Sequence, residues 1–227
     1  MRPFLPSASP RVVHLATGAD VRLRNEGARL AVVLLNGGSA KPVAGTWSAT
    51  SELLARELAL RFPDVAFAEV RYRLKTWKEL DSCMADAREA IDQVERGGAR
   101  RVALVGFSMG GAVSIGVAGD EAVAGVIGLA PWIPPQLRVD GLRGKRFDVV
   151  HGAWDRYVPG IPGVNPSHSR AAFDRVRGAG VAGTYRLIAR GLHGAAVRRR
   201  DGTLVRLPRW QSWVAETAAA LARYETA

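Results

Sequence analysis

Apolar and polar residues alternate in blocks along the chain. Eight short blocks are rich in Val, Leu, Ile and Phe and are bounded by turn residues, a pattern that predicts strands. They are Arg11–Ala16, Val21–Arg24, Leu30–Leu35, Val65–Arg71, Arg101–Gly106, Gly125–Ala130, Phe147–His151 and Thr184–Ala189. From the third block onward most are almost continuously apolar, as expected of strands that are buried on both faces of a parallel sheet.

Amphipathic stretches separate these blocks and predict helices. The predicted helices are Trp47–Arg61, Glu79–Arg96, Met109–Ala118, Ser167–Arg177 and Arg209–Tyr224. A strand followed by a helix, repeated five times, predicts an α/β fold with a doubly wound, mostly parallel eight-stranded sheet that is flanked by helices. The first two strands are expected to form a short antiparallel hairpin at the sheet edge.

No repeat, low-complexity tract or composition break divides the chain, so residues 1–227 are expected to form one domain after an N-terminal arm of residues 1–10. Two stretches do not fit the alternation. Residues 131–146 form a short, lid-like connection, which is too short for a large cap domain. Residues 196–207 resemble two β-like arms around an Asp-Gly turn, which predicts an inserted β-hairpin that needs a surface to lie on. That surface is the domain body, a second subunit in a homodimer, or the rim of a site.

Composition narrows the class of protein. With 48% hydrophobic and 23% charged residues, the chain is typical of a soluble globular protein and not of a disordered or membrane-spanning one. Its start lacks an apolar run of signal-peptide length, so a cytoplasmic location is expected. The single cysteine, Cys83, cannot form an internal disulfide, and no Cys/His cluster has zinc spacing. No zinc site is therefore expected, and the catalytic residues described below imply no metal and no organic cofactor.

The net charge of +11 comes from 32 basic and 21 acidic residues, and nearly all of the excess is arginine. Such an excess is typical of a GC-rich genome, or it attracts anionic substrates or surfaces. The arginines are scattered, and Arg198–Arg200 is the only run of three. No nucleic-acid motif accompanies them, so we do not expect a nucleic-acid partner.

The strongest chemical signal lies between the fifth predicted strand and its helix, where the chain reads Gly106-Phe-Ser108-Met-Gly110. A serine nucleophile at such a place stands on a turn too sharp for bulky neighbours, and glycines on either side relieve the crowding. The following helix directs its positive N-terminal end and free N–H groups at the site. Ser108 is therefore the candidate nucleophile.

A serine hydroxyl needs a base to activate it, and four histidines are available: His14, His151, His168 and His193. His14 lies on the edge strand, His151 is expected to pack or to bond to backbone, and His168 opens a surface helix. His193 follows the last strand and precedes a glycine, which suits an imidazole on a free loop. We therefore predict His193 as the base.

The base in turn needs an acid that orients it. Asp155 follows the seventh strand, and the strand ends of an open α/β sheet deliver their loops to one edge, so Ser108, Asp155 and His193 can converge there. The rival acid is Asp140, whose arginine neighbours indicate a surface ion pair. Asp155 is the preferred acid.

Acyl transfer also needs N–H donors where negative charge develops. The third strand ends in Asn36-Gly37-Gly38, and glycines there let backbone amides approach a ligand. The predicted oxyanion donors are the amide of Met109 and one from this loop, either Gly38 or Gly37. Asn36 is expected to contact substrate or brace the loop.

Four apolar residues are candidate walls of the substrate pocket, although each suits ordinary packing equally well. They are Trp77, Trp132, Ile133 and Tyr157.

These motifs together resemble the α/β-hydrolase superfamily, and the resemblance covers essentially the whole chain. Ser108, Asp155 and His193 occur in that family's order, and residues 151–159, His-Gly-Ala-Trp-Asp-Arg-Tyr-Val-Pro, resemble the acid loop of its small serine esterase and dienelactone-hydrolase-like branches. Those branches often carry His-Gly after the third strand, whereas this chain has Asn36-Gly37.

The expected function is that of a serine hydrolase, carboxylesterase-like, which cleaves an ester, thioester or amide of a small-molecule acyl substrate through an acyl-enzyme on Ser108. Acyltransferases and peptidases use the same three residues. A catalytically idle relative that binds a ligand or a partner is the alternative from another class.

Overall fold

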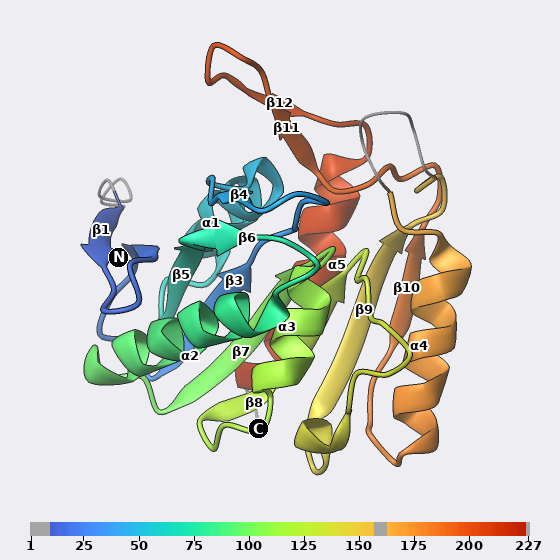
Figure 1. Cartoon of the computed structure of the whole chain (residues 1–227), viewed down its shortest axis with the longest axis horizontal. Helices are drawn as coiled ribbons and strands as arrows, with labels where there is room; N and C mark the ends of the chain where they lie inside the picture. Colours follow the sequence, from blue (N-terminus) through green and yellow to red (C-terminus); the bar gives the residue numbers. More distant parts are fainter. Residues whose placement is uncertain (1–9, 157–162, 226–227) are drawn as a thin grey trace, which may run out of the picture.

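The computed structural model describes residues 10–156 and 163–225. Its main sheet has eight strands in the order β1-β2-β5-β3-β7-β8-β9-β10 (Figure 1). Their bounds are β1 Arg11–His14, β2 Asp20–Arg24, β3 Leu30–Leu35, β5 Val65–Arg71, β7 Arg101–Phe107, β8 Val123–Leu129, β9 Arg146–Gly152 and β10 Tyr185–Ile188. The helices are α1 Ala49–Arg61, α2 Leu80–Arg96, α3 Gly110–Val117, α4 Pro166–Gly178 and α5 Trp210–Glu225.

The predicted fold class is confirmed, and every predicted strand and helix is present with small shifts at its ends. Two further strands, β4 (Val43–Ala44) and β6 (Leu74–Lys75), pair with each other outside the main sheet. The sequence pattern did not predict them, because two residues are too few to show an alternation. The connection between β8 and β9 contains one 3-10 turn, η1 (Asp140–Leu142), and no large cap.

The sheet separates two cores. In β3, Ala31 and Val33 pack into one core, while Val32 and Leu34 pack into the other, because successive side chains of a strand point to opposite faces. Helices α2, α3 and α4 cover the first face, and α1 and α5 cover the second (Figure 1). Both faces of the central strands are therefore buried, which explains their continuous apolar runs.

The strand directions bring the functional loops to one edge of the sheet. Strands β1 and β2 form the predicted antiparallel edge hairpin, and β2 also pairs antiparallel with β5. The remaining neighbours in the main sheet, β5, β3, β7, β8, β9 and β10, are parallel. The chain order reverses at β3, which lies between β5 and β7. Ligands of open α/β sheets bind at such a switch point, outside the carboxyl ends of the strands.

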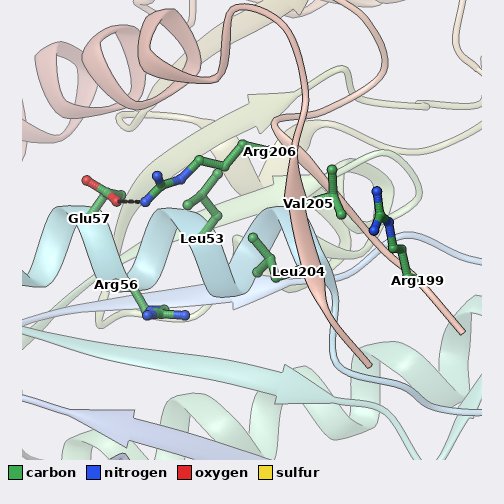
Figure 2. Close-up of a pocket in the computed structure, with 7 residues that line it drawn as sticks. All are labelled: Leu53, Arg56, Glu57, Arg199, Leu204, Val205 and Arg206. Atoms are coloured by element: carbon green, nitrogen blue, oxygen red, sulfur yellow. Dashed lines mark hydrogen bonds and ion pairs between the residues drawn. The ribbon is translucent and has the colours of Figure 1, made fainter. Parts of the chain in front are cut away.

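The arginine-rich stretch 196–207 forms two short antiparallel strands, β11 (Ala196–Arg198) and β12 (Leu204–Arg206), and this hairpin lies on α1. Arg198 donates to Glu52 at 2.6 Å and Arg206 to Glu57 at 3.3 Å. A pocket of about 400 Å³ is lined by residues of both the helix and the hairpin, among them Leu53, Glu57, Leu204 and Arg206 (Figure 2). The hairpin therefore contacts the domain body, which is one of the three surfaces considered for it.

Across residues 10–156 and 163–225, no helix is both long enough and apolar enough to cross a membrane.

Candidate active site

Ser108 occupies a strained turn between β7 and α3. Its φ of 54° lies in the left-handed region, which a residue with a side chain rarely adopts. The flanking glycines are required by close approach: a Cβ at Gly106 would lie 2.3 Å from the carbonyl oxygen of Gly110, and one at Gly110 would lie 2.2 Å from that of Leu35. The turn is therefore packed tightly against the end of β3, and only glycine fits two positions before and two positions after the serine.

Backbone hydrogen bonds hold this turn from the neighbouring strand. The N–H of Ser108 donates to the carbonyl of Leu129 at 2.9 Å, and its own carbonyl accepts from the N–H of Trp132 at 2.9 Å. Because both partners belong to the end of β8 and the loop after it, the left-handed conformation is fixed by the tertiary structure. The Ser108 hydroxyl is thereby held at the carboxyl edge of the sheet.

The predicted acid and base contact each other directly. Nδ1 of His193 lies 2.6 Å from Oδ2 of Asp155, which is fully buried, while the histidine side chain is 14% exposed. The other oxygen, Oδ1, accepts the N–H of Val164 at 3.0 Å. Burial alone would raise the pKa of the Asp155 carboxyl, but hydrogen bonds from His151 and His193 outweigh it and hold that pKa below its ordinary value. The Asp155 carboxylate is thus an ionised hydrogen-bond acceptor that is buried from solvent.

A threonine of α1 fixes the loop that carries His193. The hydroxyl oxygen of Thr50 accepts the N–H groups of Ala195 at 3.1 Å and Ala196 at 3.3 Å. The imidazole ring lies 4.9 Å, centroid to centroid, from the ring of Phe107, the residue before Ser108. The structure therefore brings the acid–histidine pair beside the turn of the serine.

Sequence reasoning missed two contributors to this arrangement. Thr50 carried no signal, because nothing in a helix start predicts a partner on a distant loop. His151 was expected to pack or to bond to backbone, and it is buried with its Nε2 2.9 Å from the carbonyl oxygen of Val164, but the same Nε2 also lies 3.0 Å from Oδ2 of Asp155. Its place four residues before the acid, in the same motif, was the signal that could have found it.

The loop after β3 meets the serine turn. A Cβ at Gly38 would lie 2.3 Å from Sδ of Met109 and 2.4 Å from Cδ1 of Trp77, and one at Gly37 would lie 3.4 Å from Cβ of Ser108. Among the described residues, no acceptor takes up the N–H of Gly38 or of Met109. Both amides are therefore available beside the serine.

The polar side-chain atoms of Asn36 form hydrogen bonds within the protein. Its side chain is buried, and its amide donates to the carbonyls of Val70 at 2.6 Å and Thr46 at 3.2 Å. Its oxygen accepts from the hydroxyl of Ser51 at 3.0 Å. Of the two roles expected for Asn36, these contacts favour bracing of the loop over contact with substrate.

The candidate wall residues differ in their surroundings. Trp77 and Trp132 are half-buried neighbours with ring centroids 6.3 Å apart. Ile133 is buried, donates its N–H to Nε2 of His168 at 3.3 Å, and lines a small pocket of about 170 Å³ against α4. Tyr157 lies outside the described residues.

The rival acid and the edge histidine lie elsewhere. Asp140 is exposed on η1 and forms an ion pair with Arg138 at 3.0 Å, as expected of a surface pair. His14 is exposed on the edge strand β1 and pairs with Asp20. Of the two candidate acids, Asp155 and Asp140, only Asp155 contacts His193 in the part of the chain that the structure describes.

A mostly parallel eight-stranded sheet, with a serine on a sharp strand-to-helix turn and an acid–histidine pair on later loops, defines an α/β hydrolase. The chain belongs to the alpha/beta hydrolase family, whose model matches residues 32–227. Among curated proteins, no relative is found by sequence.

Solved structures share the fold at low identity. A sugar hydrolase from Lactococcus lactis is 17% identical, with 96% of this chain and 99% of that chain covered and a TM-score of 0.70. A putative alpha/beta hydrolase from Agrobacterium tumefaciens is 14% identical, with 96% of each chain covered and a TM-score of 0.68. The dienelactone hydrolase from Anabaena variabilis is 15% identical, with 93% and 95% covered and a TM-score of 0.63. At these identities the likeness is one of fold.

Proposed function

We propose that this protein is a serine hydrolase that cleaves a small-molecule carboxylic ester through an acyl-enzyme on Ser108. The observation that carries the proposal is the 2.6 Å hydrogen bond between His193 and the buried Asp155, on loops at the same sheet edge as the strained Ser108 turn. A nucleophile, a base and an orienting acid are the three groups that acyl transfer to a serine requires.

In the first half of the reaction, Oγ of Ser108 attacks the ester carbonyl carbon and its proton moves to Nε2 of His193. The tetrahedral intermediate collapses, the carbon–oxygen bond of the leaving group breaks, and His193 returns the proton to the departing alkoxide. Water then attacks the acyl-enzyme with His193 again taking a proton, and the acid product leaves as Ser108 regains its hydrogen. Asp155 keeps the imidazole oriented and stabilises its charged form throughout.

The developing oxyanion is bound by backbone amides. Met109 at the start of α3 and Gly38 in the loop after β3 both offer an N–H without a protein acceptor among the described residues. Gly37 is the alternative donor from the same loop. The positive end of α3 adds to this stabilisation.

The family and the fold support hydrolysis, and activity on a panel of substrates identifies the acyl and leaving groups. The solved relatives are named for different substrates, a sugar hydrolase and a dienelactone hydrolase. Ester hydrolysis is proposed before amide hydrolysis, because an alkoxide leaves more readily than an amine, and thioesters are attacked by the same three residues.

The test is covalent labelling with a fluorophosphonate probe, followed by a panel of p-nitrophenyl esters of increasing chain length. Wild type should be labelled and active, and Ser108→Ala should lose both. Asp140→Asn, an exposed acid replaced in the same way as Asp155→Asn, is the matched control and should keep full activity. A wild-type protein that neither reacts with the probe nor turns over esters, thioesters or amides would contradict the proposal and favour a ligand-binding role.

A further inference from the structure

His151 forms part of a buried hydrogen-bond chain that ends at the acid. It lies in β9, and its side chain is fully buried. Its Nδ1 lies 2.7 Å from the hydroxyl of Ser169 on α4, which lies 2.8 Å from the hydroxyl of Tyr185 on β10. Its Nε2 faces Asp155. A polar chain of this length inside a protein is costly unless each member has a partner, and here each one has.

The surroundings of Nε2 decide where the His151 proton lies. Nε2 is 3.0 Å from Oδ2 of Asp155 and 2.9 Å from the carbonyl oxygen of Val164. An ionised carboxylate and a carbonyl only accept hydrogen bonds, so Nε2 must carry a hydrogen and donate it. The Ser169 hydroxyl at the other nitrogen can either donate or accept, so His151 is a donor to Asp155 whether it is neutral or charged.

The two histidines share one oxygen of the acid. Oδ2 accepts from Nδ1 of His193 and from Nε2 of His151, while Oδ1 is occupied by the amide of Val164. We propose that His151 is a positioning residue for the reaction: it holds the Asp155 carboxylate turned toward His193 and limits how strongly the carboxylate attracts the proton of His193. This inference rests on the proposed function.

The geometry has a consequence for proton affinity. Each hydrogen bond donated to a carboxylate stabilises its ionised form. Removing the His151 donor therefore leaves Asp155 more basic, and the Asp155–His193 pair binds its shared proton more tightly. Since His193 must be unprotonated to act as a base, activity should then be lost at a higher pH on the acid side.

Few other charged or titratable groups of the described residues lie near the hydrogen-bond chain of His151, Ser169 and Tyr185. From α4, Cζ of Arg170 lies 3.7 Å from the centroid of the Tyr185 ring. The negative charge of Asp174, also on α4, contributes to raising the pKa of the same tyrosine. Burial raises the pKa of the Tyr185 hydroxyl, so it stays a neutral donor at working pH. Within residues 10–156 and 163–225, the other titratable groups next to His151 are Asp155 and, across it, His193.

Two amide substitutions separate the proposed role from simple packing. In His151→Gln the amide nitrogen reaches the position of Nε2, so a donor to Asp155 is kept. In His151→Asn the shorter amide reaches only the position of Nδ1 and Ser169. The Asn variant should shift the acid limb of kcat/KM upward by about one pH unit and lower kcat roughly tenfold with little change in KM. The Gln variant should stay within about threefold of wild type, with its acid limb unmoved.

A matched control is another histidine–aspartate pair of the same chain. His14→Asn removes the histidine that pairs with Asp20 on the exposed edge strand, and it should change neither the pH profile nor kcat. Equal acid limbs in His151→Asn and wild type, with both proteins folded and active, would overturn the proposal.

A second measurement does not depend on activity or on any variant folding. In 15N-histidine NMR of the wild type, Nε2 of His151 should be protonated across the pH range of the folded protein. A spectrum in which Nε2 of His151 lacks its hydrogen would overturn the proposal outright. If Ser108→Ala proved as active as wild type, the proposed function would fail, and the protonation of Nε2 would still decide the bond to Asp155.

Discussion

Thr50 connects α1 to the loop of His193, and its removal should loosen the site. Its hydroxyl is buried and makes three hydrogen bonds: it accepts the N–H groups of Ala195 and Ala196, and it donates to the carbonyl of Ala196 at 3.2 Å. Thr50→Val keeps the shape and removes all three. Two buried N–H groups are then left without an acceptor.

The magnitude follows from those two amides. A buried donor without a partner costs about 1–3 kcal/mol, and partial relaxation of a loop lowers the sum, so Thr50→Val should reduce the free energy of unfolding by about 2–4 kcal/mol. Because Ala195 lies two residues from His193, the imidazole should lose its fixed orientation. We expect kcat to fall roughly tenfold with KM nearly unchanged, and Thr50→Ser to restore most of both.

Thr217 on α5 offers a matched control. It is equally buried, but its hydroxyl donates only to the carbonyl of Trp213, at 2.7 Å within its own helix. That carbonyl also accepts from the helix backbone, so Thr217→Val should cost less than about 1 kcal/mol. Urea denaturation gives the free energy of unfolding, and p-nitrophenyl acetate hydrolysis gives kcat and KM, for wild type, Thr50→Val, Thr50→Ser and Thr217→Val. Equal stability and equal kcat for the two valine variants would refute the reasoning.

Three further outcomes are expected. Ser108→Ala, His193→Ala and Asp155→Asn should each lower turnover by orders of magnitude without unfolding the chain, and their effects should not add, because the three groups act as one unit; additive losses would contradict that. Asn36→Ala should lose about 1–3 kcal/mol of stability and lower kcat more than it raises KM, and an unchanged protein would make the bracing contacts irrelevant. Arg198→Gln should cost at most about 1 kcal/mol, with the loss shrinking at high salt, as thermal unfolding at two ionic strengths would show; a loss independent of salt would argue against an ion pair.

Much of the fold could be predicted from the sequence because its signals are local. The apolar run of β3 and the one-sided pattern of α2 each lie within a single element, and burial on one or both faces imposes that period directly. The Ser108 turn was equally visible, since the flanking glycines that its crowding demands are its neighbours in the chain. The order of Ser108, Asp155 and His193, after the fifth, seventh and eighth predicted strands, then indicated the sheet edge where they meet.

Only the tertiary structure decided which side chains contact each other. His193 and Asp155 are 38 residues apart, and Thr50 and Ala196 are 146 apart. No periodicity records such pairs, because the distance between two loops depends on how the whole sheet is ordered and twisted. The shared oxygen of Asp155 shows this most clearly: whether His151 only packs or donates to the acid depends on a few ångströms, and the folding of β9 against α4 and β10 sets them. The sequence determined which elements form and which residues are candidates for the reaction, while long-range packing determined their partners.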